Sequence, residues 1–303
     1  MQSVFDELYE NSLAKCEFKN LISIITAEEN IRLAYRNLKK NAGSRTPGTD
    51  GKTIADLAKM SEPELIGFVQ QKFNWYQPQS VRRKEIPKGN GKTRPLGIPT
   101  IMDRLIQQCV LQVMEPICEA KFCETSNGFR PNRGVENALA QAEKHMQKSN
   151  LHIVIDIDIK GFFDNVNHGK LLRQIWTMGI HDKKLLSIIS AMLKAEVAGI
   201  GFPEKGTPQG GILSPLLSNI VLNELDWWIT SQWVGMPTRH EYSGKIHENG
   251  TKDQSKKYRE LRKTNLKECY IVRYADDFKI FCRKHSDAVK LFEATRAWLK
   301  ERL

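Results

Sequence analysis

A pair of adjacent carboxylates, Asp276 and Asp277, lies between two apolar segments of the chain. Residues 269–273 precede the pair and residues 278–282 follow it, and both segments are rich in strand-forming residues. The pattern predicts a β-hairpin that carries both acids at its tip. Like charges this close repel each other, so a nearby positive charge is needed to hold them. Mg²⁺ prefers oxygen ligands such as these carboxylates, so a metal site is one interpretation of the pair. The other is an acidic turn exposed to solvent, which is the commoner case for an isolated Asp-Asp pair.

A second predicted strand carries further acids. Isoleucines alternate with Asp156 and Asp158 over residues 153–158, so strand periodicity places the two acids on one face. An acid late in a buried strand costs free energy unless it is paired or bound to a metal. Together with the acidic hairpin, this segment favours a metal-binding cluster over a solvated turn.

Composition limits the classes of protein that fit. The chain has 303 residues, enough for one large domain or two smaller ones, and its formal net charge is +11. That excess of positive charge favours a polyanionic partner such as RNA or DNA. The six cysteines form no Cys-x-x-Cys pair, which argues against zinc and suits a reducing compartment. No apolar run approaches the roughly 20 residues that span a membrane, and the first residues lack a signal-peptide pattern.

Two basic segments are candidate RNA contacts. Residues 26–40 begin with Thr26-Ala27-Glu28-Glu29, a capping-box pattern that predicts a helix, and residues 229–268 form a polar, basic insertion. Each segment fits two interpretations, an ordinary solvated surface or an RNA-binding surface. The candidate residues are Arg32, Arg36, Lys39 and Lys40 in the helix, and Lys256, Lys257, Arg262 and Lys263 in the insertion.

Other patterns predict the elements around these segments. Residues 81–99 predict a basic hairpin that turns at Asn90-Gly91; its charge either protects an edge strand or binds phosphate, and charge at the tip favours phosphate. Residues 206–211 predict a glycine-rich loop, and Ser214 with Pro215 predicts the helix start that follows it. Further helices are predicted over residues 61–75, 100–120, 135–147 and 287–303. The last of these helices has no stop signal, so we expect the natural chain to continue.

In chain order, the basic hairpin, the strand ending at Asp158, residues 208–210 and residues 274–277 resemble the motifs of the reverse transcriptase family. The closer resemblance is to the maturases encoded by group II introns. It rests on residues 86–88, 94–99, 128–131 and 161–164, which are similar to the fingers and palm signatures of that group. The resemblance covers nearly the whole chain from about residue 30.

The resemblance implies an α+β fold of the right-hand polymerase type. Its fingers are rich in helices, its palm has an antiparallel sheet packed on helices, and the thumb is expected to be absent. The domains implied are a basic helical extension at 1–40, fingers at 41–150 and a palm at 151–303 that contains the insertion at about 229–268. Part of residues 170–205 is assigned either to the palm or to the fingers.

The resemblance also implies two-metal phosphoryl transfer, in which Asp158, Asp276 and Asp277 hold two Mg²⁺ ions, with Mn²⁺ as a substitute. The residues before Asp158 depart from the family pattern, so Asp156 is assigned as a structural acid outside the site. The residues implied in dNTP binding are Lys88, Arg94, Phe163, Gln209 and Gly210. Phe163 lies where the family places a ring that excludes a 2′-hydroxyl.

The function implied is that of an RNA-directed DNA polymerase which binds its group II intron RNA, assists splicing and copies the intron into DNA. The partners are intron RNA, an RNA template with a DNA primer, dNTPs, and target DNA through regions outside this chain. An RNA-binding splicing cofactor with an idle polymerase site is the alternative; a retron or diversity-generating reverse transcriptase is a third. We expect a cytoplasmic ribonucleoprotein in a bacterium or an organelle, no membrane partner, and weak polymerisation by this fragment alone. Whether two copies of the chain form a homodimer does not follow from the sequence.

Overall fold

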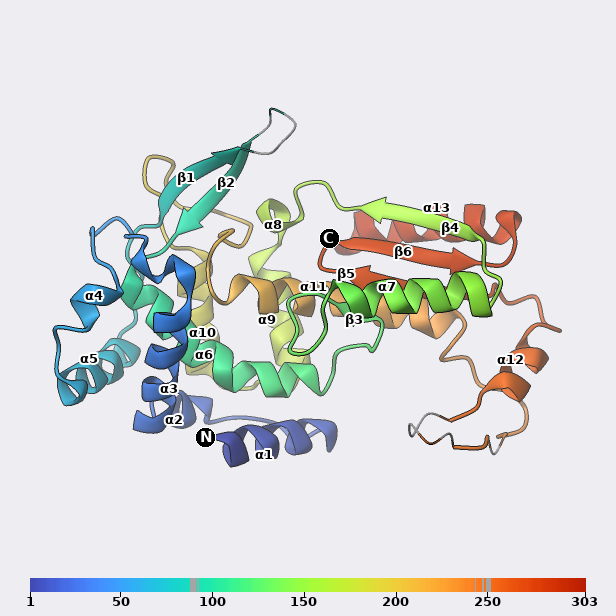
Figure 1. Ribbon diagram of the computed structural model, residues 1–303, viewed down its shortest axis with the longest axis horizontal. Coiled ribbons are helices and arrows are strands. Elements are labelled where there is room, and N and C mark those ends of the chain that lie inside the picture. Colours follow the sequence, from blue (N-terminus) through green and yellow to red (C-terminus); the bar gives the residue numbers. More distant parts are fainter. Residues whose placement is uncertain (88–90, 92, 243, 247, 249–251) are drawn as a thin grey trace. The chain divides into compact units, whose positions relative to one another are not determined.

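The computed structural model describes residues 1–87, 91, 93–242, 244–246, 248 and 252–303 (Figure 1). These residues form two compact units, each assembled from two stretches of the chain. Unit 1 consists of residues 1–122 and 160–221, and unit 2 of residues 123–159 and 222–303. The division into an N-terminal extension, fingers and palm that the resemblance implies stays a prediction.

Unit 1 is built around one long buried helix. The helix α6 (Ile101–Glu119) begins where the sequence predicts, because the Thr100 hydroxyl accepts a hydrogen bond from the Asp103 N–H. Three N-terminal helices pack against α6. The helices of the unit, in chain order, are α1 (Gln2–Leu13), α2 (Leu21–Ile25), α3 (Glu28–Lys40), the 3₁₀ helix η1 (Ala42–Arg45), α4 (Ile54–Leu57), α5 (Glu62–Asn74), α6, α8 (Phe162–Asn165), α9 (His168–Thr177) and α10 (Lys183–Leu193).

The basic hairpin of unit 1 forms as predicted in its described part. Strands β1 (Arg82–Pro87) and β2 (Thr93–Ile98) pair antiparallel, with Arg82 opposite Ile98 and Pro87 opposite Thr93. Asn90 of the predicted turn lies outside the described residues. Ile98 is buried while most of the described part of the hairpin is exposed, and the exposed residues include Arg83, Lys84 and Arg94.

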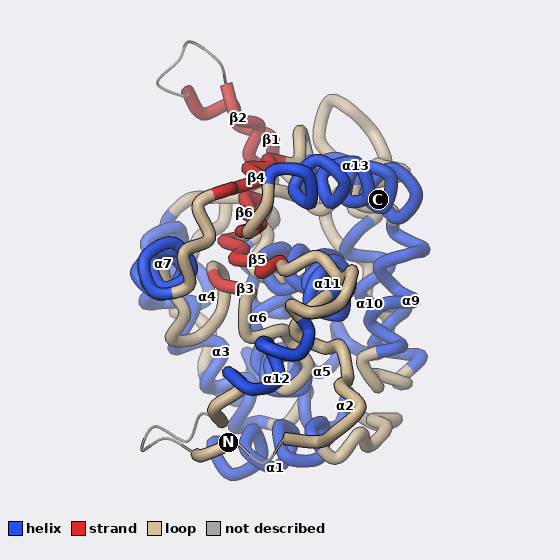
Figure 2. The backbone as a smooth tube through the Cα atoms, turned by 90° about the vertical axis from the view of Figure 1, so that its right-hand side faces the viewer, coloured by secondary structure: helices blue, strands red, loops and turns tan. Residues whose placement is uncertain are grey.

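Unit 2 contains a four-stranded sheet in the order β3-β5-β6-β4, which Figure 2 shows from one side. Its elements are β3 (Ser126–Asn127), α7 (Val135–Glu143), the π-helical turn η2 (Lys144–Lys148), β4 (Ile153–Asp158), α12 (Ser255–Leu261), β5 (Cys269–Tyr274), β6 (Asp277–Cys282) and α13 (His285–Arg302). The helix α11 (Ser214–Gln232) spans the boundary between the two stretches assigned to the units.

The sheet differs in one respect from the antiparallel sheet implied by the resemblance. The β4–β6 and β5–β6 pairs are antiparallel, but β3 runs parallel to β5. Sequence periodicity does not predict β3, because a strand of two residues shows no alternation of apolar and polar side chains. Packing on helices is confirmed: α13 contacts β4 and β6, and α7 contacts β3 and β5. The α+β class is therefore confirmed.

Of two helix starts predicted from the sequence, one is wrong and one is confirmed. The capping box predicted at Thr26 is wrong, because Thr26 ends α2 and its hydroxyl donates to the Ile22 carbonyl at 2.8 Å. The next helix begins at Glu28 without a side-chain cap. The helix start predicted at residue 61 is confirmed, since Ser61 is the N-cap of α5 and its N–H donates to the Glu64 carboxylate at 2.8 Å. Within the described ranges, no helix has the length and apolar character needed to cross a membrane.

Candidate active site

The two predicted acidic segments meet as neighbouring strands of unit 2. The register of β4 and β6 sets Asp158 directly opposite Asp277, and Asp156 directly opposite Lys279. Residues two apart on a strand share a face, so these four side chains lie on one face of the sheet. Directly opposed residues have Cβ atoms about 4.5–5.5 Å apart, close enough for two carboxylates to share one cation.

The acidic face is open to solvent. Asp156, Asp158 and Asp277 are exposed, and Asp276 is half-buried. The expectation that Asp158 ends a buried strand is therefore wrong for this face, because only the opposite face, represented by Ile155, is buried. Because these carboxylates stay in contact with water, holding several of them together costs little free energy even where a carboxylate has no protein partner.

Lys279 adds a positive charge to the same face. Its Nζ lies 2.7 Å from Asp156 Oδ1 and 3.5 Å from Asp277 Oδ1. The hydrogen bond with Asp156 raises the pKa of Lys279 above its ordinary value. Asp156, assigned from the sequence as a structural acid, thus has a cross-strand partner. Lys279 gave no signal in the sequence because its contact with Asp156 spans 123 residues of chain.

A two-residue turn joins β5 to β6 and carries Asp276. Because Tyr274 pairs with Asp277, the turn consists of Ala275 and Asp276. Ala275 has a φ of 56°, in the left-handed region that costs a residue with a side chain roughly 1–2 kcal/mol. The Ala275 N–H donates to the Asn127 carbonyl at 3.1 Å. This contact links the acidic turn to β3. The left-handed conformation, which glycine often supplies in such turns, is therefore stabilised here by a hydrogen bond to a neighbouring strand.

Gly128 follows β3 and lies against the turn. It has a φ of 79°, and a Cβ atom at this position would lie 2.9 Å from the Ala275 nitrogen and 3.1 Å from the Tyr274 ring. Cβ contacts under 3.0 Å essentially never occur. Glycine is therefore required here for two reasons, its conformation and the closeness of the turn.

The donor set fits a hard divalent cation. Asp158, Asp276 and Asp277 offer only carboxylate oxygens, which Mg²⁺ prefers. Among the residues described, no group of three His, Cys, Asp or Glu side chains is already gathered as a metal site. Carboxylates repel one another when no cation lies between them. A divalent ion would offset that repulsion, so the chemistry of the three acids fits such an ion.

The candidate dNTP-binding residues belong to unit 1. Arg94 Nε donates to Gln209 Oε1 at 2.7 Å, and the Gln209 carbonyl accepts from the Gly97 N–H at 2.6 Å. Gly210 has a φ of 111°, and a Cβ there would lie 2.5 Å from the Gly97 carbonyl oxygen. β2 and the glycine-rich loop thus bring Arg94, Gln209 and Gly210 together. Lys88 lies outside the described residues.

Phe163 lies on the short helix α8 of the same unit. Its side chain is 7% exposed, and its ring meets that of Phe162 edge-on at a centroid distance of 5.5 Å. The Phe163 carbonyl accepts from the Thr207 N–H at 2.7 Å, which anchors α8 to the glycine-rich loop. A cavity of about 360 Å³ in unit 1 is bordered by this loop and includes Asp164 and Gln209 in its lining. The loop therefore has space beside it for part of a ligand.

The eight candidate RNA contacts fall into two groups. Four are already bound to protein acceptors: Arg32 to Glu28 and Glu62, Lys257 to the Val234 carbonyl, Arg262 to Glu268, and Lys263 to Glu260. The other four, Arg36, Lys39, Lys40 and Lys256, are exposed and form no ion pair with any residue that the structure describes. This second group has the side chains best placed to reach phosphate, because no such ion pair has to break first.

Comparison with known proteins adds independent information. A family model described as reverse transcriptase (RNA-dependent DNA polymerase) matches residues 86–302. The chain is 34% identical over 275 residues to Protein YkfC of Escherichia coli (strain K12), covering 88% of this chain and 71% of that protein. It is 37% identical over 240 residues to the group II intron-encoded protein LtrA of Lactococcus lactis subsp. cremoris, covering 75% of this chain but only 38% of LtrA. Among solved structures it is similar to a partial Cas6-RT-Cas1–Cas2 complex, at 20% identity and a TM-score of 0.47, over 93% of this chain and 41% of that one.

Proposed function

Because the chain belongs to the reverse transcriptase (RNA-dependent DNA polymerase) family, we propose that Asp158, Asp276 and Asp277 form its metal-binding catalytic centre. The observation that carries this proposal is the register that sets Asp158 opposite Asp277, next to the turn that holds Asp276. Reverse transcriptases in general use divalent metals. Bound Mg²⁺, or Mn²⁺ in its place, supplies the Lewis acidity that activates a primer 3′-hydroxyl and stabilises leaving pyrophosphate.

The protein's own contribution to this reaction is charge and position. The three carboxylates bind and orient the cations, and the β5–β6 turn keeps two of them at one end of the sheet. In unit 1, the Arg94 guanidinium binds the triphosphate of the incoming dNTP, with Gln209 fixing its orientation through a 2.7 Å hydrogen bond. Lys88 adds charge to the same triphosphate. Gly210 lets the backbone approach the nucleotide closely.

Phe163 selects deoxyribonucleotides in this proposal, since a packed ring leaves no room for a 2′-hydroxyl. Phe163→Ala is expected to lower the preference for dNTP over NTP by about 10- to 100-fold, the range that pocket size controls. The measurement is single-nucleotide incorporation with dNTP and with NTP, reported as the ratio of the two kcat/KM values. Phe162→Ala is the matched control, because Phe162 is the adjacent buried ring. A selectivity equal to that of the parent in Phe163→Ala would remove Phe163 from this role.

We further propose that the chain acts on group II intron RNA, binding it to assist splicing and copying it into DNA. The similarity to LtrA, which is encoded by a group II intron, supports this partner. The net charge of +11 supports a nucleic-acid partner in general. On α3, the exposed Arg36, Lys39 and Lys40 are the proposed contacts, while Arg32 is engaged by two glutamates.

Changing Arg36, Lys39 and Lys40 together to glutamine is expected to weaken binding of intron RNA and to spare polymerisation on an unrelated template. Each lost phosphate contact should reduce the slope of log affinity against log salt by about 0.7–0.9. The measurement is a salt titration of RNA binding, with primer extension on a generic template beside it.

The control for this experiment removes three equal charges from an exposed part of α13, at Lys290, Arg296 and Lys300. If α3 is a dedicated binding surface, the control variant should keep a larger share of its intron affinity. Equal losses in the two variants, or equal loss of polymerisation and intron binding in the α3 variant, would count against such a surface.

A further inference from the structure

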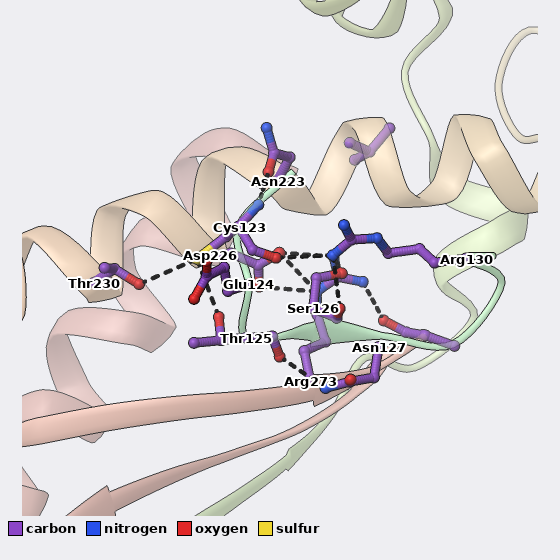
Figure 3. A network of polar contacts seen from close by, with 12 residues as sticks. Cys123, Glu124, Thr125, Ser126, Asn127, Arg130, Asn223, Asp226, Thr230 and Arg273 are labelled. Atoms are coloured by element: carbon purple, nitrogen blue, oxygen red, sulfur yellow. Dashed lines mark hydrogen bonds and ion pairs between the residues drawn. The ribbon is translucent and has the colours of Figure 1, made fainter. Parts of the chain in front are cut away.

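Arg273, which lies on β5 two residues before Ala275 of the acidic turn, is completely buried in unit 2. Its side chain and that of Asp226 on α11 are both 0% exposed. Arg273 Nε lies 2.9 Å from Asp226 Oδ1, and Nη2 lies 2.7 Å from Asp226 Oδ2, so the two side chains form a two-pronged ion pair (Figure 3). A buried ion pair of this kind is costly to desolvate, and such pairs are weak evidence for stability. Its place next to the turn calls for another explanation.

The remaining donors of the Arg273 guanidinium reach the turn and the neighbouring strand. Nη1 donates to the Ala275 carbonyl at 2.7 Å, and Nη2 donates to Ser126 Oγ at 2.6 Å. Ser126 belongs to β3 and is the register partner of Arg273. One planar group therefore binds a helix, a strand and the turn at once.

The Ala275 peptide units are held from both sides. The N–H donates to the Asn127 carbonyl, while the carbonyl accepts from Arg273. These two contacts fix the orientation of a residue whose φ of 56° is unfavourable for alanine. Asp276 and Asp277 follow immediately, so the direction of their carboxylates depends on this conformation.

The strand that holds the turn is itself anchored. Arg130 Nη1 donates to the Cys123 and Ser126 carbonyls at 2.9 and 2.8 Å. Asn223 on α11 accepts a hydrogen bond from the Cys123 N–H at 3.1 Å. Figure 3 shows these contacts converging on the segment from Cys123 to Asn127. Ser126, one of the acceptors of Arg273, is thus part of a segment held by several hydrogen bonds.

We propose that Arg273, Asp226 and Ser126 are positioning residues, which hold Ala275 in its left-handed conformation so that Asp276 and Asp277 are aimed for metal binding beside Asp158. This inference rests on the proposed function of the three acids. Asp226 orients the guanidinium, Arg273 grips the turn, and Ser126 fixes the distance between β3 and the turn.

The test replaces the ion pair by apolar side chains, Asp226→Leu with Arg273→Met. Such replacements often leave a protein as stable as before, because no unpaired charge stays buried. The variant is expected to fold, as judged by circular dichroism and thermal unfolding, but it lacks a donor for the Ala275 carbonyl. We expect kcat for single-nucleotide addition to fall by about 10²-fold, the effect of a misplacement near 1 Å, with little change in the KM for primer–template.

Metal binding supplies a readout that does not depend on catalysis. Mn²⁺ binding followed by electron paramagnetic resonance should be weaker in the double variant than in the parent. Adding Ala275→Gly to the double variant should restore part of the lost rate, because glycine adopts a positive φ without penalty. If the Arg273–Asp226 pair contributed only to the stability of the fold, adding Ala275→Gly would not restore the rate.

The outcomes separate two failures. A parent protein that adds no nucleotide contradicts the proposed function, while the comparison of Mn²⁺ binding still tests the positioning role. An active parent with an equally active, folded double variant overturns the positioning role alone. If the double variant does not fold, Ser126→Ala takes its place: it removes one acceptor of Arg273, and parent-like kcat and Mn²⁺ binding in that variant would overturn the inference.

Discussion

Replacing Asp158 with asparagine is expected to lower the rate of nucleotide addition by about 10³-fold, the scale on which loss of one electrostatic contact to a transition state reduces kcat. Asparagine keeps the size of the side chain and one oxygen, but it loses the charge that holds a hard cation. The rate is measured by single-nucleotide extension over a range of Mg²⁺ concentrations. Because Asp158 faces Asp277 directly, removing one like charge should also raise the unfolding midpoint slightly.

Asp156→Asn is the matched control for this substitution. Asp156 lies two residues away on the same strand and the same exposed face, but its partner is Lys279. Its loss should change the rate only a few-fold, through the release of Lys279 near Asp277. Equal losses in the two variants would show that general negative charge matters and would contradict a specific role for Asp158. A parent-like rate in Asp158→Asn would contradict it as well.

Gly128→Ala is expected to damage both stability and activity. An alanine at this position adopts a positive φ, which costs about 1–3 kcal/mol, and its Cβ meets the Ala275 nitrogen at 2.9 Å. Relief of that contact requires the turn to move, so the rate of nucleotide addition should fall by about 10²-fold. The measurements are denaturant unfolding, for the free energy of unfolding, and single-nucleotide extension.

Gly51→Ala separates the backbone strain from the contact with the turn. Gly51 has a φ of 71°, but a Cβ there would meet nothing within 4 Å. Its substitution should cost only the left-handed strain, about 1–2 kcal/mol, and leave the rate unchanged. If Gly128→Ala keeps the parent rate despite a comparable loss of stability, the turn does not depend on Gly128.

The sequence was sufficient for the parts of the candidate site that have local signals. Alternation of apolar and acidic residues placed Asp156 and Asp158 on one face, and the apolar segments around Asp276 predicted the hairpin. The pairing of β4 with β6 was not predicted; once the two strands pair, the same alternation favours the observed register, because a slip of one residue would move the apolar side chains to the wrong face. The exposure of the acidic face did not follow, since burial depends on which elements cover a strand.

The frame behind the turn was not predicted, because its contacts are distant in sequence. Arg273 binds Ser126 across 147 residues and Asp226 across 47. One signal was available: Arg273 is a charged residue in an otherwise apolar strand, which costs free energy unless it has a buried partner. The identity of that partner could not be read from periodicity, because Asp226 lies on a helix.

Polymerase activity is measured by RNA-templated primer extension by the protein as its gene encodes it, with dNTPs or NTPs and with Mg²⁺ or a chelator. We expect DNA synthesis with dNTPs that requires the metal and is abolished by Asp276→Ala with Asp277→Ala. A folded protein that binds the primer–template but adds no nucleotide would contradict the catalytic role of the three acids. It would instead favour an RNA-binding splicing cofactor whose polymerase site is idle.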